Sequence, residues 1–202
     1  PSVQPGTSGY LEVGPFVNPL EVATKAVTRA EGDVHPQGNP HVTLDPVRAG
    51  QIAMKMAERF SQLDASHTAD YTKNAQDFQK RLDEKTKTWQ ALVKASGVTQ
   101  VVTYHKTLTY FLARFGLANP EILEPKPGIP PTSAHTLQVI ETIKSKKVPL
   151  ILVENYFDPT VTKKIKSEVS TVHAETVPVS VDGAPDVKNL DDLYEHLIKA
   201  IE

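Results

Sequence analysis

The stretch that decides the fold is Val101-Val102-Thr103-Tyr104-His105-Lys106-Thr107-Leu108-Thr109-Tyr110-Phe111. It begins inside a run of apolar and β-branched residues over 98–103, which predicts a buried strand. Helical spacing follows from Leu108 to Phe115, and Gly116 predicts the end of that helix. A strand that leads directly into a helix is the unit from which parallel sheets are built, so this stretch predicts an α/β fold.

The same order of strand and helix repeats to the end of the chain. Strand patterns cover 121–124, 150–153 and 175–181, and helical patterns cover 133–147, 159–169 and 190–201. This alternation predicts a parallel sheet with helices on its faces. Residues 97–202 are therefore expected to form one α/β lobe at the C-terminal end.

Two helical patterns precede this lobe. The first begins at Asp45 and Pro46, a capping residue followed by a residue suited to the first helical turn, and it ends near Gln62. The second covers about 66–95, which at 1.5 Å per residue makes a rod of roughly 45 Å. Such a rod favours a link between two lobes, and an ordinary packed helix is the alternative. We therefore divide the chain into residues 1–64, a linking helix over 65–96, and the lobe over 97–202.

Composition excludes several classes of protein. The chain has 202 residues, with 22 basic and 24 acidic side chains interspersed along it, so nucleic acid is not an expected partner. No cysteine is present, which leaves His, Asp and Glu as the strong metal ligands. No apolar run reaches the roughly 18 residues needed to span a bilayer, so no direct membrane insertion is expected. The first residue is Pro1, so we expect a piece of a longer protein.

Candidate metal ligands gather at one edge of the predicted sheet. His105, Glu154 and Asp182 each lie just after a predicted strand, and the carboxyl ends of parallel strands share one edge. Imidazole and carboxylate are ligands of zinc, and His41, from a proline-flanked loop, would complete a tetrahedron. A lone histidine at a strand end is more often satisfied by a backbone carbonyl, but the shared edge favours a metal site. His35 could be a ligand, a donor to a ligand or a solvated residue, and we rank the solvated state first.

Catalysis is less favoured by the sequence. The chain has no His-Glu-x-x-His helix, no Gly-x-Ser-x-Gly turn and no glycine-rich phosphate loop. A metal ion held by four protein groups has no free position for a substrate, so it is carried or structural. We therefore expect a protein that is not an enzyme, with a metal-dependent hydrolase using the same residues as the alternative.

Four motifs in register resemble one known family. They are Asn39-Pro40-His41 with Leu44-Asp45-Pro46; Tyr104-His105 with Arg114-Phe115-Gly116-Leu117; Glu124-Pro125-Lys126-Pro127-Gly128-Ile129-Pro130-Pro131; and Val153-Glu154-Asn155-Tyr156-Phe157. Their order and spacing over about 31–202 are similar to those of the zinc/manganese solute-binding proteins of ABC importers, the adhesin-like group. Each motif alone is weak, whereas four in register are specific.

The resemblance implies a fold and a role. The fold would have two α/β lobes with parallel sheets flanked by helices, joined by a long rigid helix, with the N-terminal lobe incomplete in this chain. The resemblance places metal ligands at His41, His105 and Asp182, and Glu154 is the reserve carboxylate. It also implies a periplasmic, extracytoplasmic protein that delivers its ion to a membrane permease.

The metal is expected to be zinc because the site is rich in imidazole, with manganese or iron as the other candidates. A third reading, besides importer component and hydrolase, is an adhesin-like interaction protein whose histidines are incidental. An incomplete lobe would expose apolar surface, which favours dimerisation.

Overall fold

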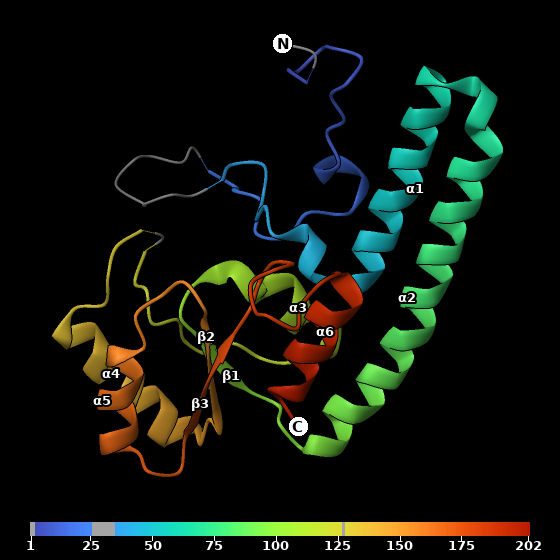
Figure 1. Cartoon of the computed structure of the whole chain (residues 1–202). Helices are drawn as coiled ribbons and strands as arrows, with labels where there is room; N and C mark the ends of the chain where they lie inside the picture. The colour runs from blue at the N-terminus through green and yellow to red at the C-terminus, as the bar shows by residue number, and fades with distance from the viewer. Residues whose placement is uncertain (1–2, 26–34, 127) are drawn as a thin grey trace.

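The computed structural model describes residues 3–25, 35–126 and 128–202 (Figure 1). Two long helices, α1 and α2, form an antiparallel pair that projects from an α/β body. The helices are α1 (Pro46–Leu63), α2 (Thr68–Ser96), α3 (Thr109–Phe115), α4 (Ser133–Lys146), α5 (Thr160–Glu168) and α6 (Leu190–Lys199). The strands are β1 (Val101–Thr103), β2 (Leu150–Glu154) and β3 (His173–Val177). Short 3₁₀ turns include η3 (Val42–Leu44), η4 (Ala65–His67) and η5 (Lys106–Leu108).

The three strands form a parallel sheet in the order β1-β2-β3. Alternate residues of the strands enter two different apolar cores, as a two-residue side-chain period requires. Leu150 and Leu152 pack with side chains of α2, α3 and α6, whereas Ile151 and Val153 pack with side chains of α4 and α5. Helices therefore cover both faces of the sheet (Figure 1). The α/β class and the parallel sheet predicted from the sequence are confirmed.

The strand boundaries differ from the prediction in several places. Strand β1 begins at Val101 rather than at residue 98, and β2 extends one residue further, to Glu154. The edge strand β3 covers His173–Val177 rather than 175–181, because Pro178 has no N–H to continue the ladder. Residues 121–124, predicted as a strand, make only an isolated parallel bridge between Ile122 and Thr103, with backbone bonds from Leu123 and Glu124 that extend it. Residues 122–124 still run alongside β1, so Glu124 lies near the carboxyl ends of the strands.

Helix α2 has 29 residues, about 43 Å at 1.5 Å per residue. Its first half packs on α1, where Gly50 allows close approach because a Cβ there would lie 3.0 Å from Cγ of Gln79. Its second half packs on the α/β body through Leu82 and Trp89, which are buried in the same core as α6. The division of the chain at residues 64 and 96 stays a prediction.

Among the described residues, none of the helices combines the length and apolarity that crossing a bilayer requires.

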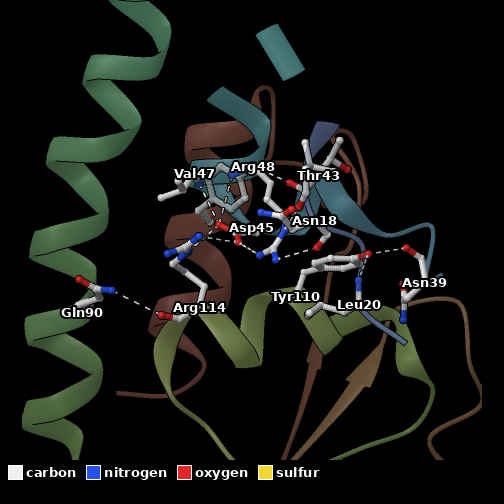
Figure 2. Close-up of polar contacts among 12 residues, drawn as sticks. Asn18, Leu20, Asn39, Thr43, Asp45, Val47, Arg48, Gln90, Tyr110 and Arg114 are labelled. Atoms are coloured by element: carbon white, nitrogen blue, oxygen red, sulfur yellow. Dashed lines mark hydrogen bonds and ion pairs between the residues drawn. The ribbon is translucent and has the colours of Figure 1, made fainter. Parts of the chain in front are cut away.

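The carboxylate of Asp45 joins the loop before α1 to the α/β body (Figure 2). Asp45 is fully buried and caps α1 by accepting a hydrogen bond from the backbone N–H of Val47 at 2.9 Å. Its two oxygens also accept bonds from Nε and Nη2 of Arg114 on α3, at 2.8 and 2.9 Å, and it pairs with Arg48. Nearby, the hydroxyl of Tyr194 on α6 donates to the carbonyl of Thr43 at 2.6 Å. The loop over 39–45 is thus held against two helices of the body.

Replacing Asp45 by asparagine tests this junction. The variant D45N keeps the size of the side chain but leaves two arginines without their buried counter-charge, so we expect the free energy of unfolding to fall by about 3 kcal/mol. Urea unfolding measures the difference. Glu58→Gln is the control, because Glu58 pairs with Lys55 at an exposed site of α1, where the loss should stay below about 0.5 kcal/mol. Equal stabilities of D45N and the parent chain would show that the junction does not stabilise the fold.

Candidate metal centre

His105 lies two residues after the end of β1 and is the N-cap residue of the turn η5. Its position is fixed on two sides. The backbone N–H of Tyr104 donates to the carbonyl of Leu152 in β2, and the N–H of His105 donates to Oε1 of Glu154 at 3.3 Å. Nδ1 of the imidazole contacts Oε2 of Glu124. The ring is therefore anchored through Nδ1, an arrangement that would leave Nε2 for an ion.

His41 lies in the loop before α1, at the start of η3. The side chain of Asn39 organises this loop: Oδ1 accepts hydrogen bonds from the backbone N–H of His41 at 3.0 Å and from its Nδ1 at 2.8 Å. The amide of the same asparagine donates to the carbonyl of Lys106, next to His105, at 2.8 Å. The hydroxyl of Tyr110 donates to the carbonyl of Asn39 at 2.8 Å (Figure 2). Asn39 thus connects the loop of His41 to the segment that carries His105.

The two imidazoles lie side by side although they are far apart in the sequence. The centroids of His41 and His105 are 5.9 Å apart, with an angle of 82° between the ring planes. Two imidazoles bound through nitrogen to one tetrahedral zinc ion, at about 2.0–2.1 Å each, would have centroids roughly 5.2 Å apart. The observed separation of the centroids is therefore within about 1 Å of the value for two imidazoles on one zinc ion.

His41 is in the protonation state that a metal ligand needs. Burial lowers the pKa of His41 from 6.5 to about 4, and the charges of His105 and His35 act in the same direction. A neutral imidazole presents a lone pair to an ion, whereas an imidazolium does not. Because Nδ1 of His41 donates to Asn39, this lone pair is on Nε2.

Glu154 is the last residue of β2, and its side chain contacts the backbone N–H of His105. It is fully buried, and burial raises its pKa from 4.5 to about 7. Oε1 accepts from the N–H of His105, whereas Oε2 has no hydrogen-bond partner among the described residues. A buried carboxylate oxygen without a hydrogen-bond partner destabilises the folded state. Oε2 of Glu154 is therefore an acceptor that a ligand could satisfy.

The predicted ligand Asp182 lies in the loop after β3. Its side chain is 72% exposed and pairs with Nζ of Lys188 at 2.8 Å, not with either histidine. The loop itself is tied to the end of β2, because Nδ2 of Asn155 donates to the carbonyl of Gly183 at 2.7 Å. His35 is exposed, at the edge of the described segment. Over residues 3–25, 35–126 and 128–202, no group of three or more His, Cys, Asp or Glu side chains has the arrangement of a complete metal site.

The structure also shows two residues that sequence reasoning did not single out. Asn39 and Glu124 each contact Nδ1 of a predicted ligand histidine. Both belong to quoted motifs, the first before Pro40-His41 and the second before Pro125, but a motif does not show which side chains meet. The assignment of His41, His105, Asp182 and Glu154 as ligands stays a prediction.

The buried carboxyl of Glu154 gives a pH-dependent stability. In the unfolded chain this group loses its proton above about pH 4.5, while the folded protein retains it up to about pH 7, so folding becomes less favourable as the pH rises between these values. Relative to Glu154→Gln, the parent chain should lose about 3 kcal/mol of unfolding free energy across this window.

Urea unfolding of both proteins in EDTA, from about pH 4 to pH 8, tests the expectation. The titration of His41 is common to both proteins and cancels in the difference. A difference that does not change with pH would contradict burial of an ionisable carboxyl at this position.

Comparisons with known proteins support the fold and identify the family. The model of the ZnuA family, described as zinc-uptake complex component A periplasmic, matches residues 10–202. ZnuA of Brucella abortus, a high-affinity zinc uptake system protein, is 30% identical over 159 residues, which are 79% of this chain and 46% of that protein. The chain thus spans about half the length of this curated relative.

Two solved structures show the same fold. A Zn(II)-bound variant of AdcAII of Streptococcus pneumoniae superposes with a TM-score of 0.74 and 27% identity, covering 96% of this chain and 70% of that one. The laminin-binding adhesin Lmb of Streptococcus agalactiae gives a TM-score of 0.77 with 22% identity, covering 96% and 71%. The fold, the order of the motifs and the match over nearly the whole chain lead to one conclusion: this chain belongs to the ZnuA family of solute-binding proteins.

Proposed function

We propose that this chain binds a zinc ion between His41 and His105 and is part of the extracytoplasmic component that delivers zinc to an ABC-type importer. Membership of the ZnuA family supports the transport role, and the relatives of that family named above are a zinc uptake protein and a Zn(II)-bound protein. The observation that carries the proposal is the pairing of two imidazoles from two segments of the fold, with their ring centroids 5.9 Å apart.

The donor set favours zinc over manganese. Imidazole nitrogen suits zinc, copper and nickel, whereas manganese prefers sites richer in oxygen. Two histidines fill half of a tetrahedral zinc site. We propose that a carboxylate completes the protein ligands, from Asp182 if it leaves Lys188, or from the unpartnered oxygen of Glu154. His35, six residues before His41, is a further candidate.

The role we propose is capture and release, without catalysis. The family is one of transport-related binding proteins, and the pair of histidines is surrounded by groups that anchor it through hydrogen bonds rather than by a nucleophile with its base. Turnover of an activated ester by the zinc-loaded chain, lost on removing His105, would instead favour a hydrolase.

Zinc titration of single-histidine variants tests the site. In competition with a chromophoric chelator, His41→Ala and His105→Ala should each weaken zinc binding by at least about tenfold, because each removes one ligand. His173→Ala is the control, since His173 is an exposed residue of β3 and should leave the affinity unchanged. Unchanged affinity in both site variants would show that these imidazoles do not bind the ion.

We also retain the expectation that the chain self-associates. The groove between α1 and α2, with a volume of about 290 Å³, is lined mainly by apolar side chains such as Met56, Phe60 and Phe78. Met56 and Phe60 are 43% and 44% exposed, and contiguous exposed apolar surface favours association. Analytical ultracentrifugation should detect a dimer at high concentration, and Phe60→Glu should weaken it. A parent chain that stays monomeric at every concentration would contradict this expectation.

A further inference from the structure

Glu124 is buried beside the candidate metal centre without being one of its predicted ligands. Its side chain is 5% exposed, and Oε2 contacts Nδ1 of His105. The other oxygen, Oε1, accepts a hydrogen bond from the backbone N–H of Gly128 at 2.8 Å. The backbone is fixed as well, because the N–H of Glu124 donates to the carbonyl of Tyr104 at 2.9 Å. Both oxygens of the carboxylate are therefore engaged, and the backbone of the residue is fixed as well.

The loop after Glu124 is shaped to hold this carboxylate. Gly128 has φ = +82°, a conformation that glycine adopts without strain. This backbone turns its N–H towards Glu124, while the N–H of Ile129 donates to the carbonyl of Lys126 at 2.9 Å and closes the turn. The backbone of Gly128, within the same motif, thus helps to fix the direction of the Glu124 carboxylate.

The two ligand histidines differ in the group that faces Nδ1. His41 donates to the neutral amide oxygen of Asn39, whereas His105 faces a carboxylate. A carboxylate accepts hydrogen bonds, so it places the proton of His105 on Nδ1 and leaves the lone pair on Nε2.

We propose that Glu124 is a positioning residue for zinc binding: it fixes the tautomer and the orientation of the His105 imidazole. The inference rests on the proposed function. Glu124 itself does not bind the ion, because its oxygens are directed at His105 and Gly128.

Glu124→Gln separates this role from simple packing. The variant is almost isosteric, and its carbonyl oxygen can still accept from Gly128. Its amide then faces Nδ1 of His105 as a donor, which moves the imidazole proton to Nε2 and blocks the lone pair that would bind zinc. We expect zinc binding to weaken by about 10–100-fold. Urea unfolding of the variant, compared with that of the parent chain, checks that the fold is retained.

Glu121→Gln is the matched control. It removes the same charge three residues away, and the carboxylate of Glu121 interacts with the N–H of Ile122 and with Gln138 rather than with His105. Its zinc affinity should stay within about twofold of that of the parent chain. Equal losses in both variants would mean that local charge, and not the contact with His105, is responsible, and would overturn the proposal.

Nitrogen-15 NMR of the zinc-free proteins gives a readout that is independent of metal binding. At about pH 8, the parent chain should show His105 protonated at Nδ1, and E124Q should show it protonated at Nε2. A parent spectrum with the proton on Nε2 overturns the proposal, even if E124Q fails to fold. If His105→Ala binds zinc as tightly as the parent chain, the proposed function fails instead, so the two failures are distinguishable.

Discussion

The buried ion pair between Asp45 and Arg114 is the contact on which the candidate metal centre depends (Figure 2). Asp45 lies four residues after His41, and Arg114 is on the helix that follows His105. The same carboxylate starts α1 by capping its first turn. A single buried group therefore sets where α1 begins and where the loop of His41 lies on the body. Asn39 adds a second connection through the carbonyl of Lys106.

These connections determine how the site can bind an ion. The cost of ordering two loops is met when the chain folds, before the ion arrives, so more of the binding free energy is retained as affinity. Burial adds a second effect, because it keeps His41 neutral and ready to bind. The structure therefore has two imidazoles anchored through Nδ1, and their centroids are separated by nearly the distance expected for two imidazoles on one tetrahedral zinc ion.

The sequence predicted the features that follow from local rules. Strand and helix patterns gave the parallel sheet, and the rule that parallel strands end at one edge placed His105 and Glu154 together, as the structure shows. The pair of capping residues Asp45 and Pro46 marked the start of α1 to the residue. The resemblance to the zinc/manganese solute-binding proteins is confirmed by the match to the ZnuA family.

Other features depend on contacts between distant segments and could not be predicted. Asp182 follows a predicted strand, but β3 ends early before Pro178, and the intervening loop leaves the carboxylate on the surface with Lys188. Glu124, the partner of Nδ1 of His105, comes from a loop 19 residues further along the chain, and a motif does not show which distant side chains meet. Asn39 lies only two residues before His41, but its amide also contacts the carbonyl of Lys106, 67 residues away, and the motif does not show that contact.

The most direct test is X-ray absorption at the zinc edge of the zinc-loaded chain, combined with anomalous diffraction from its crystals. The account predicts one zinc ion with two imidazole nitrogens at about 2.0–2.1 Å, contributed by His41 and His105. An ion bound elsewhere, or held by only one of these two rings, would contradict it.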